Sequence, residues 1–361
     1  MKKKEVKVAA KKPVDPTAAA PPGSGIFGLS DSLAESKVVL MPVPWEVTTS
    51  YRGGTAKGPA AILQASHQVE LYAHGYGNPY KAGIHMLPMS QKIRALNVAS
   101  RPKALKVIKA GEEAVAHSKT LKRLQHEVNL AGGELNRIVY RKTKELLALG
   151  KLVGVVGGDH SVPYGAIKAI AETVGKEGFG ILHVDAHMDL RVRFEGFDWS
   201  HASIMHNVMR DFPEVTRLVQ VGIRGFCEDE MLAEKASNRR IHTLYQEDLA
   251  RELDSNQTWH EICDEAIKHL PRNVYLSFDI DGLSETLCPN TGTPVPGGLS
   301  WSDALVLISQ LYLRHRIIGF DLNEVSPGEL WKPGNPDTWD ANVGASLLYK
   351  MIGAMLLSHQ E

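Results

Sequence analysis

The sequence predicts an α/β fold in which helices cover a mostly parallel sheet of about eight strands. Three observations predict this fold. Short apolar runs rich in β-branched residues recur along the 361-residue chain, and segments with helical periodicity separate most of these runs. No fixed-period repeat or flexible linker interrupts the chain after Gly25. We therefore expect one domain over 26–361 rather than two.

The expected elements follow one another along the chain. Strands are expected at 38–41, 83–86, 152–156, 180–184, 218–222, 240–244, 274–278 and 317–320. Helices are expected at 164–174 and 303–312, where apolar residues recur at helical spacing. The stretch 101–149 is rich in Ala, Lys, Glu and Leu, and its one obvious break is Ala131-Gly132-Gly133. We expect two helices that meet at this break.

The composition favours a globular protein that acts on small polar molecules. Lys plus Arg and Asp plus Glu both number 41, so the chain lacks the basic surplus typical of proteins that bind nucleic acid or anionic membranes. Three cysteines without C-x-x-C spacing argue against a disulfide scaffold and for a reducing, cytoplasmic location. No apolar window approaches the length of a membrane span.

The first segment, 1–25, differs from the rest of the chain. It carries six lysines between Lys2 and Lys12, and then a Pro/Ala-rich stretch without the apolar run of a signal peptide. We expect a disordered tail here. An arm that binds nucleic acid or a partner is the alternative, but a short lysine run is more often a solvated chain end.

Side chains with metal-ligand chemistry follow three of the expected strands, 152–156, 180–184 and 274–278. They are four carboxylates and two imidazoles: His160, Asp185, His187, Asp189, Asp279 and Asp281. Ligands of open α/β sheets bind at the carboxyl ends of the strands, so we expect these six residues to converge. Oxygen and imidazole ligands suit a pair of divalent cations such as manganese better than soft metals.

Each motif also has an ordinary structural interpretation. His160 alone could be a hydrogen-bonded core histidine, and the Asp-x-Asp pair at 279–281 is common in loops. The run 157–161 could bind phosphate through backbone amides, but the G-x-x-x-x-G-K-[ST] spacing is absent. Gathering four carboxylates without cations would be costly, so the six residues together favour a metal site.

Three more residues are candidates for other roles. His183 lies inside an apolar run, where we expect a hydrogen-bonded core histidine. His201 follows the Asp185–Asp189 cluster in a predicted loop, where the ordinary alternative is a solvated histidine. Glu324 follows the expected strand 317–320, where a carboxylate could pair with a cationic substrate.

These residues, in this order, resemble the ureohydrolase family, the arginase and agmatinase group. Pro44 with 50–59 looks like the family's N-terminal signature, 292–298 like its glycine-rich loop, and 324–327 like its late acidic motif. The resemblance spans nearly all of the chain after the tail. It implies a three-layer α/β/α fold with an eight-stranded parallel sheet, and homo-oligomers that are commonly trimers or hexamers.

The resemblance also implies a binuclear centre made by the six residues above, with manganese as the first expectation and nickel as the alternative. Asp189 counts both as a ligand and as a catalytic residue. Glu324 would hold the guanidinium group of the substrate, and His201, in Ser200-His201-Ala202-Ser203, would match the proton-shuttling histidine.

Such a centre would hydrolyse a C–N bond of a guanidino compound. Two cations about 3.5–4 Å apart can share a bridging water, lower its pKa and hold the hydroxide against the guanidinium carbon. The cations and Glu324 would stabilise the tetrahedral intermediate, and His201 would protonate the leaving amine. Urea would leave with an amine, or with ammonia if the substrate is free guanidine.

The choice of substrate stays open at this point. The loop before His201 is more similar to agmatinases than to arginases, which favours an agmatine-like cation. The tail and the long helical stretch resemble an extended agmatinase-like branch that includes nickel-dependent guanidine hydrolases. Trp199 could narrow the pocket for such a small substrate, or pack on a subunit neighbour.

Two further alternatives remain. A guanidino acid or formimidoylglutamate would need a cationic partner for its carboxylate, and Arg191 is the nearest candidate. A metal-binding scaffold without activity is the non-enzyme alternative. The presence of all six ligands and of Glu324 argues against that scaffold.

Overall fold

The computed structural model describes residues 14–21, 23–335 and 339–360. Half of the expected tail, 1–13, therefore lies outside the described residues. Of the part that is described, Val14 lies against the apolar core, and Ala20 contacts Gly28. The domain boundary at residue 25 stays a prediction.

The sheet has eight strands, all parallel, in the order β2-β1-β3-β8-β7-β4-β5-β6. This confirms the expected α/β fold. The strands are β1 (Val38–Val43), β2 (Ile84–Met86), β3 (Leu152–Gly157), β4 (Phe179–Val184), β5 (Val215–Ile223), β6 (Ile241–Tyr245), β7 (Asn273–Asp279) and β8 (Arg316–Asn323).

The strand order places four chemically important strand ends side by side. Strands β3, β8, β7 and β4 are consecutive in the middle of the sheet. Their registers are aligned at the carboxyl ends: Leu322 pairs with both Val156 and Phe278, and Phe278 pairs with Val184. Parallel strands end on the same edge of the sheet, so the loops after these four strands share one location.

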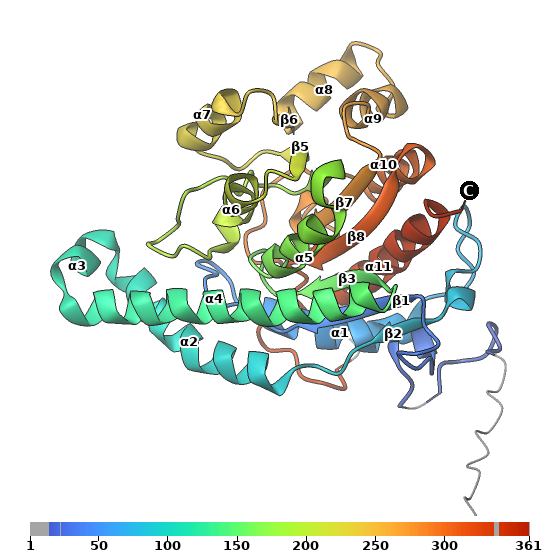
Figure 1. Ribbon diagram of the computed structural model, residues 1–361, viewed down its shortest axis with the longest axis horizontal. Helices are drawn as coiled ribbons and strands as arrows, with labels where there is room; N and C mark the ends of the chain where they lie inside the picture. Colours follow the sequence, from blue (N-terminus) through green and yellow to red (C-terminus); the bar gives the residue numbers. More distant parts are fainter. Residues whose placement is uncertain (1–13, 22, 336–338, 361) are drawn as a thin grey trace, which may run out of the picture.

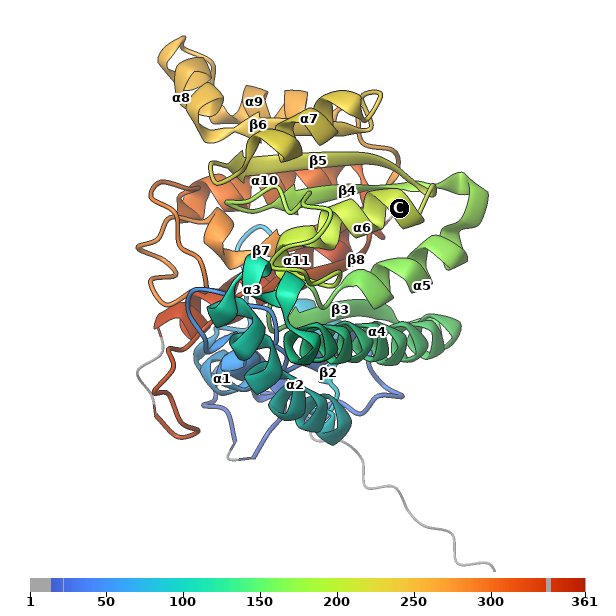
Figure 2. The same ribbon diagram turned by 90° about the vertical axis from the view of Figure 1, so that its left-hand side faces the viewer.

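Helices cover both faces of the sheet and complete three layers (Figure 1; Figure 2). One face is covered by α1 (Gly58–Ala65), α8 (Gln246–Asp254), α9 (Trp259–Ile267), α10 (Trp301–Arg314) and α11 (Trp339–Leu357). The other is covered by α2 (Gln91–Ala110), α4 (Lys119–Ala148), α5 (Tyr164–Val174) and α6 (Ile204–Asp211). Side chains alternate along β4 and so pack against both helix layers. Leu182 and Val184 pack on the first face and Ile181 on the second.

The expected break at Gly132-Gly133 is wrong. Helix α4 runs through both glycines, and the chain instead breaks at Gly111 and Ser118, on either side of the short α3 (Glu112–His117). Gly111 has a φ of 78°, which only glycine adopts at little cost, and Ser118 caps α4 by accepting the Leu121 amide. Two glycines cost a helix only about 1 kcal/mol each, and burial of Val128, Ala131, Leu135 and Val139 outweighs that cost.

Within the described part of the chain, none of the helices combines the length and apolar character that a membrane crossing requires.

Candidate active site

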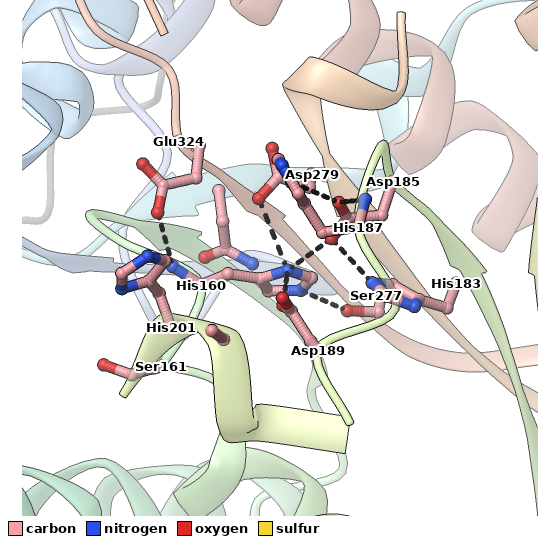
Figure 3. A network of polar contacts seen from close by, with 12 residues as sticks. His160, Ser161, His183, Asp185, His187, Asp189, His201, Ser277, Asp279 and Glu324 are labelled. Carbon is pink, nitrogen blue, oxygen red and sulfur yellow. Dashed lines mark hydrogen bonds and ion pairs between the residues drawn. The ribbon is translucent and has the colours of Figure 1, made fainter. Parts of the chain in front are cut away.

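The six residues with metal-ligand chemistry meet at the carboxyl edge of the four central strands. Figure 3 labels all of them except Asp281. Their ligand atoms fall into two groups that share Asp185. One contains His160, Asp185 and Asp189 together with His183, with Asp279 beside it, and the other contains Asp185, His187 and Asp281. Segments more than a hundred residues apart in the sequence thus form one cluster, as expected from the strand ends.

His160 occupies the centre of the first group. Its Nε2 lies 2.9 Å from Ser277 Oγ, and that hydroxyl donates to Asp321 Oδ1, so Ser277 accepts the Nε2 proton. The other ring nitrogen, Nδ1, faces three carboxylate oxygens, of Asp185 at 2.9 Å, Asp189 at 3.1 Å and Asp279 at 3.3 Å. One nitrogen carries at most one proton, so hydrogen bonding cannot satisfy all three carboxylates. A cation among these four groups would.

The second group is more open to solvent. His187 Nδ1 lies 3.2 Å from Asp281 Oδ2 and 3.4 Å from Asp185 Oδ1, and its side chain is 28% exposed. Asp281 Oδ1 also accepts the amide of Ala186, which ties the loop after β7 to the loop after β4. A cation bound in this group would therefore be accessible from solvent.

Loop conformation, rather than strand alternation, brings these residues together. Strand β4 ends at Val184 and β7 ends at Asp279, so most of the cluster lies beyond regular strand. Asp189 has a φ of 54° and Glu324 a φ of 58°, in the left-handed region that L residues rarely adopt. Such conformations persist where surrounding contacts hold them, and they concentrate at functional sites.

The donor set fits divalent cations. The residues Asp185, Asp189, Asp279 and Asp281 are all buried, and within the described part of the chain no lysine or arginine forms an ion pair with any of them. Four buried carboxylates without cations would carry a large desolvation penalty. The oxygen and imidazole donors are those that manganese and similar metals accept.

The pKa values show the same charge imbalance. Burial, together with the charges of Asp281 and Asp185, raises the pKa of Asp279 well above its ordinary value. Burial and the Asp185 charge raise the pKa of Asp189 to about 7. Burial alone would lower the pKa of His160, but the carboxylates of Asp185, Asp189 and Asp279 outweigh it and raise that pKa. Without cations the cluster therefore holds protons.

His183 belongs to this network, but not as a ligand. The Gln220 amide nitrogen lies 2.9 Å from His183 Nδ1 and can only donate, so Nδ1 accepts and the proton resides on Nε2. Nε2 then donates to Asp185 Oδ2 at 2.8 Å. This tautomer has no lone pair toward the cluster, which agrees with the expected core histidine. This hydrogen bond fixes the orientation of Asp185, as a supporting partner of a metal ligand would.

Ser277, Asp321 and Gln220 were missed by sequence reasoning. Ser277 and Asp321 support His160, and Gln220, itself bonded by Thr243, supports His183. Strand parity could have found Ser277, because it lies two residues before Asp279 on the same face of β7. Asp321 stands in an apolar strand, where a fully buried carboxylate is unusual.

Glu324 lies on the far side of His160 with one oxygen committed and one unpartnered. Its Oε1 accepts the His160 amide at 3.0 Å, while Oε2 is buried without a hydrogen-bond partner. Burial and the neighbouring charges of Asp279 and Asp159 raise the pKa of Glu324 well above its ordinary value. A Cβ at Gly292 would stand 3.0 Å from Oε2, so glycine keeps space open beside this oxygen. The free oxygen can accept from a cationic donor.

His201 lines a cavity of about 200 Å³ next to the cluster. The cavity is bounded by Ser50, His187, Asp189, Arg191, Phe194, His201, Ala202, Gly225, Glu230 and Thr293. The His201 backbone amide donates to Thr48 Oγ1, and its ring meets Phe194 edge to face. Burial, and then the charges of His187 and His160, lower its pKa to about 3, so the ring is neutral near pH 7. The neutral ring can accept a hydrogen bond at one nitrogen and donate one at the other.

Arg191 and Glu230 form the polar wall of the same cavity. Arg191 Nε lies 3.6 Å from Glu230 Oε2, and its guanidinium covers the Phe194 ring at 4.9 Å. Glu230 is almost fully buried and accepts the amides of Leu190 and Cys227. The wall therefore presents both signs of charge.

Trp199 does not line this cavity. It packs within the same chain, against Gly132 of α4 and edge to face with Tyr164 at 4.8 Å. The expectation that Trp199 narrows the pocket is therefore wrong, and its contact with a subunit neighbour stays a prediction.

Comparisons with known proteins agree with this geometry. Residues 36–352 match the model of the arginase family. The N(1)-aminopropylagmatine ureohydrolase of Thermus thermophilus is 31% identical over 334 residues, which cover 91% of this chain and 94% of that protein. Guanidinobutyrase of Pseudomonas aeruginosa is 28% identical over 318 residues, covering 86% and 83%. Proclavaminate amidino hydrolase from Streptomyces clavuligerus superposes with a TM-score of 0.68 at 20% identity, over 95% of this chain and all of that one.

Proposed function

The chain belongs to the arginase family and is a metal-dependent hydrolase of guanidino compounds, and on that premise we propose that it cleaves an agmatine-like substrate to urea and an amine. The relatives' names supply the reaction class, because aminopropylagmatine and guanidinobutyrate both carry a guanidino group. The observation that carries the proposal is His160 Nδ1, which faces three buried carboxylates whose combined charge a bound cation would balance.

We assign two divalent cations to the cluster. His160, Asp185, Asp189 and Asp279 would hold one, and Asp185, His187 and Asp281 the other, with Asp185 shared. When bound, a pair of such ions activates water for attack on the guanidinium carbon and polarises that carbon. Manganese is the first choice for this donor set and nickel the alternative, because the ligand chemistry accepts both.

The protein's own residues orient the substrate and move the protons. Glu324 Oε2, which has no other partner, would accept a guanidinium N–H and hold the planar group over the cluster. His201 would relay a proton to the leaving amine from its position on the cavity wall. Asp189 would help to hold a cation, and we also assign it a catalytic role, because its carboxylate lines the cavity where the attacking water would lose a proton.

A guanidino acid is the second candidate substrate, and Arg191 is the observation that favours it. Its guanidinium lines the cavity, where a substrate carboxylate could bind. Its pairing with Glu230 leaves the wall balanced rather than cationic, which keeps the agmatine-like cation first. Free guanidine has no chain beyond its guanidino group, so its binding would not depend on Arg191 or Glu230.

The test is turnover of the protein on agmatine, guanidinobutyrate, formimidoylglutamate and free guanidine, with and without the change Arg191→Met. An agmatine-type enzyme keeps or lowers its KM for agmatine when this positive charge is removed. A guanidino-acid enzyme instead loses affinity for guanidinobutyrate by about 10-fold or more, the scale of a lost charge-assisted hydrogen bond. A guanidine hydrolase shows no change in KM. Failure to release urea from agmatine, guanidinobutyrate or guanidine, with metal bound, would overturn the proposed function, and formamide from formimidoylglutamate alone would replace it by the formimidoyl alternative.

We further propose a cytoplasmic homo-oligomer, a trimer or hexamer, on the strength of the family resemblance. Light scattering coupled to size exclusion tests the assembly, and a monomeric mass would contradict it.

A further inference from the structure

Helix α4 and the loop that carries His201 meet along one face of the helix. We call residues 191–201 the His201 loop. Gln125, Asn129, Gly132 and Gly133 lie on one side of α4, because residues four, seven and eight positions apart share a helix face. Gln125, Asn129 and Gly132 contact the His201 loop, while the neighbouring Val128, Ala131 and Leu135 pack into the core.

Gly132 forms a notch that receives Trp199. A Cβ at Gly132 would lie 2.8 Å from Trp199 Cβ and 2.9 Å from Cδ1, closer than real Cβ contacts come. The same test at Gly133 finds only Trp199 Nε1, at an ordinary 3.7 Å. The first glycine is therefore required for the observed position of Trp199, and the second is not.

Asp198, one residue before Trp199, is held from two sides. Asn129 Oδ1 of α4 accepts the Asp198 amide at 3.0 Å, and Asn207 Nδ2 of α6 donates to the Asp198 carbonyl at 2.8 Å. Ser200 Oγ then accepts the Ala202 amide and starts the short helical turn that contains His201. The backbone on the N-terminal side of His201 is thus fixed by α4 and α6.

Helix α2 holds the segment on the other side of the His201 ring. Arg101 donates to the carbonyls of Val47 and Thr49 at 3.0 and 2.5 Å. Between them stands Thr48, whose hydroxyl accepts the His201 amide at 3.3 Å and lies 3.4 Å from its Nδ1. Helices α2 and α4 pack side by side, so one helical pair supports both segments that meet at His201 (Figure 2).

We propose that the α2–α4 pair positions His201 beside the His/Asp cluster. The contact between Gly132 and Trp199 would set the distance of the His201 ring from that cluster. This proposal rests on the proposed function for its kinetic consequence, because His201 is the proton relay there. Gly132, Asn129 and Trp199 are positioning residues, since none of them lines the cavity. An error of about 1 Å in a catalytic group can cost about 100-fold in rate.

The kinetic test compares Gly132→Ala with Gly133→Ala. Both changes replace a glycine of the same helix by a better helix former, and only the first forces Trp199 to move. We expect Gly132→Ala to lower kcat about 10-fold or more with little change in KM, and Gly133→Ala to leave both unchanged. Equal kcat in the two variants would overturn the proposal.

A double-mutant cycle separates positioning from general damage. In a His201→Asn background, Gly132→Ala should lower the residual kcat by less than about two-fold, because the group it misplaces is already gone. An equal fold-decrease of kcat in both backgrounds would mean that Gly132→Ala acts on something other than His201. Bound metal and melting temperature, measured on each variant, show whether the folded metal centre is intact.

Hydrogen exchange tests the same proposal without any substrate. The Asp198 amide donates to Asn129, so a displaced loop should exchange this proton about 10-fold faster in Gly132→Ala than in Gly133→Ala. Unchanged exchange contradicts the proposal even if the enzyme is active. Faster exchange in a protein that hydrolyses no guanidino compound would support the positioning role while the proposed function fails.

Discussion

At the scale of single residues, the site is defined by atoms that lack an ordinary partner. His160 Nδ1 faces three carboxylates, and Glu324 Oε2 is buried without a hydrogen bond. Buried polar atoms are almost always paired in folded proteins, so exceptions that gather at one strand edge call for an explanation. The first exception fits a cation and the second a cationic substrate.

Replacement of Glu324 by glutamine should separate substrate binding from metal binding. Glu324→Gln keeps the shape but removes the charge that a guanidinium would contact, and a hydrogen bond to a charged group contributes about 1.5–3 kcal/mol. We expect kcat/KM to fall about 10- to 100-fold while the metal content stays the same, measured by urea release and elemental analysis. An unchanged kcat/KM would remove Glu324 from the substrate site.

The identity of these residues could be predicted from the sequence, but their geometry could not. The strand-end rule brings His160, Asp185 and Asp279 to one edge from sequence alone. The left-handed backbone at Asp189 and Glu324 depends on tertiary contacts, which no local pattern encodes. The tautomer of His183 likewise depends on Gln220, which lies on a different strand.

At the scale of helices and strands, close approach depends on individual glycines. Gly165 of α5 faces α4, and a Cβ there would lie 2.3 Å from the Asn136 carbonyl oxygen and 2.7 Å from the Tyr140 nitrogen. Backbone atoms cannot move aside as a flexible side chain can. The contact between α4 and α5 therefore requires glycine at this position.

Gly165→Ala should destabilise the protein even though alanine is the better helix former. Overpacking costs about 1–3 kcal/mol, which exceeds the helix-propensity gain of up to about 1 kcal/mol. Gly133→Ala is the matched control, because it adds a methyl group to α4 where there is room. Denaturant unfolding should show a lower midpoint for Gly165→Ala only. Equal midpoints would show that the helices can separate slightly at no cost.

Glycine was also the source of the main error at this scale. Sequence reasoning takes a Gly-Gly pair as a break, yet in α4 the pair makes room for Trp199. The distinction depends on a residue more than sixty positions away, so no local window contains it. The eight strands, by contrast, follow from short-range apolar patterns and were located correctly.

At the scale of the whole molecule, the carboxyl edge of the sheet brings four buried carboxylates together, and their charges have to be balanced in the folded state. In the metal-free protein, burial and Asp185 raise the pKa of Asp189 to about 7, and the surrounding carboxylates raise that of His160 despite its burial. At these two groups the folded chain binds more protons than the unfolded chain. Their contribution to stability is therefore present at low pH and is lost as pH rises, from about 4 to 7 for Asp189 and above about 6.5 for His160.

Metal ions replace these protons, so they should stabilise the protein more as pH rises. We expect the difference in melting temperature between metal-loaded and chelator-treated protein to widen from pH 5 to pH 8. Thermal unfolding at several pH values measures it. A difference that is constant or that narrows toward pH 8 would contradict the assignment of these groups as ligands.

The central claim is that two cations, held by the His/Asp cluster, make this chain a guanidino hydrolase. The most direct measurement is urea release from agmatine, guanidinobutyrate and guanidine while metal-stripped protein is titrated with Mn²⁺ or Ni²⁺, with Asp279→Asn as the comparison. We predict that activity on one of these compounds is absent without metal, rises to a plateau at two ions per chain, and is lost in Asp279→Asn. Undiminished activity in the stripped protein, or silence on every compound at full occupancy, would contradict the account.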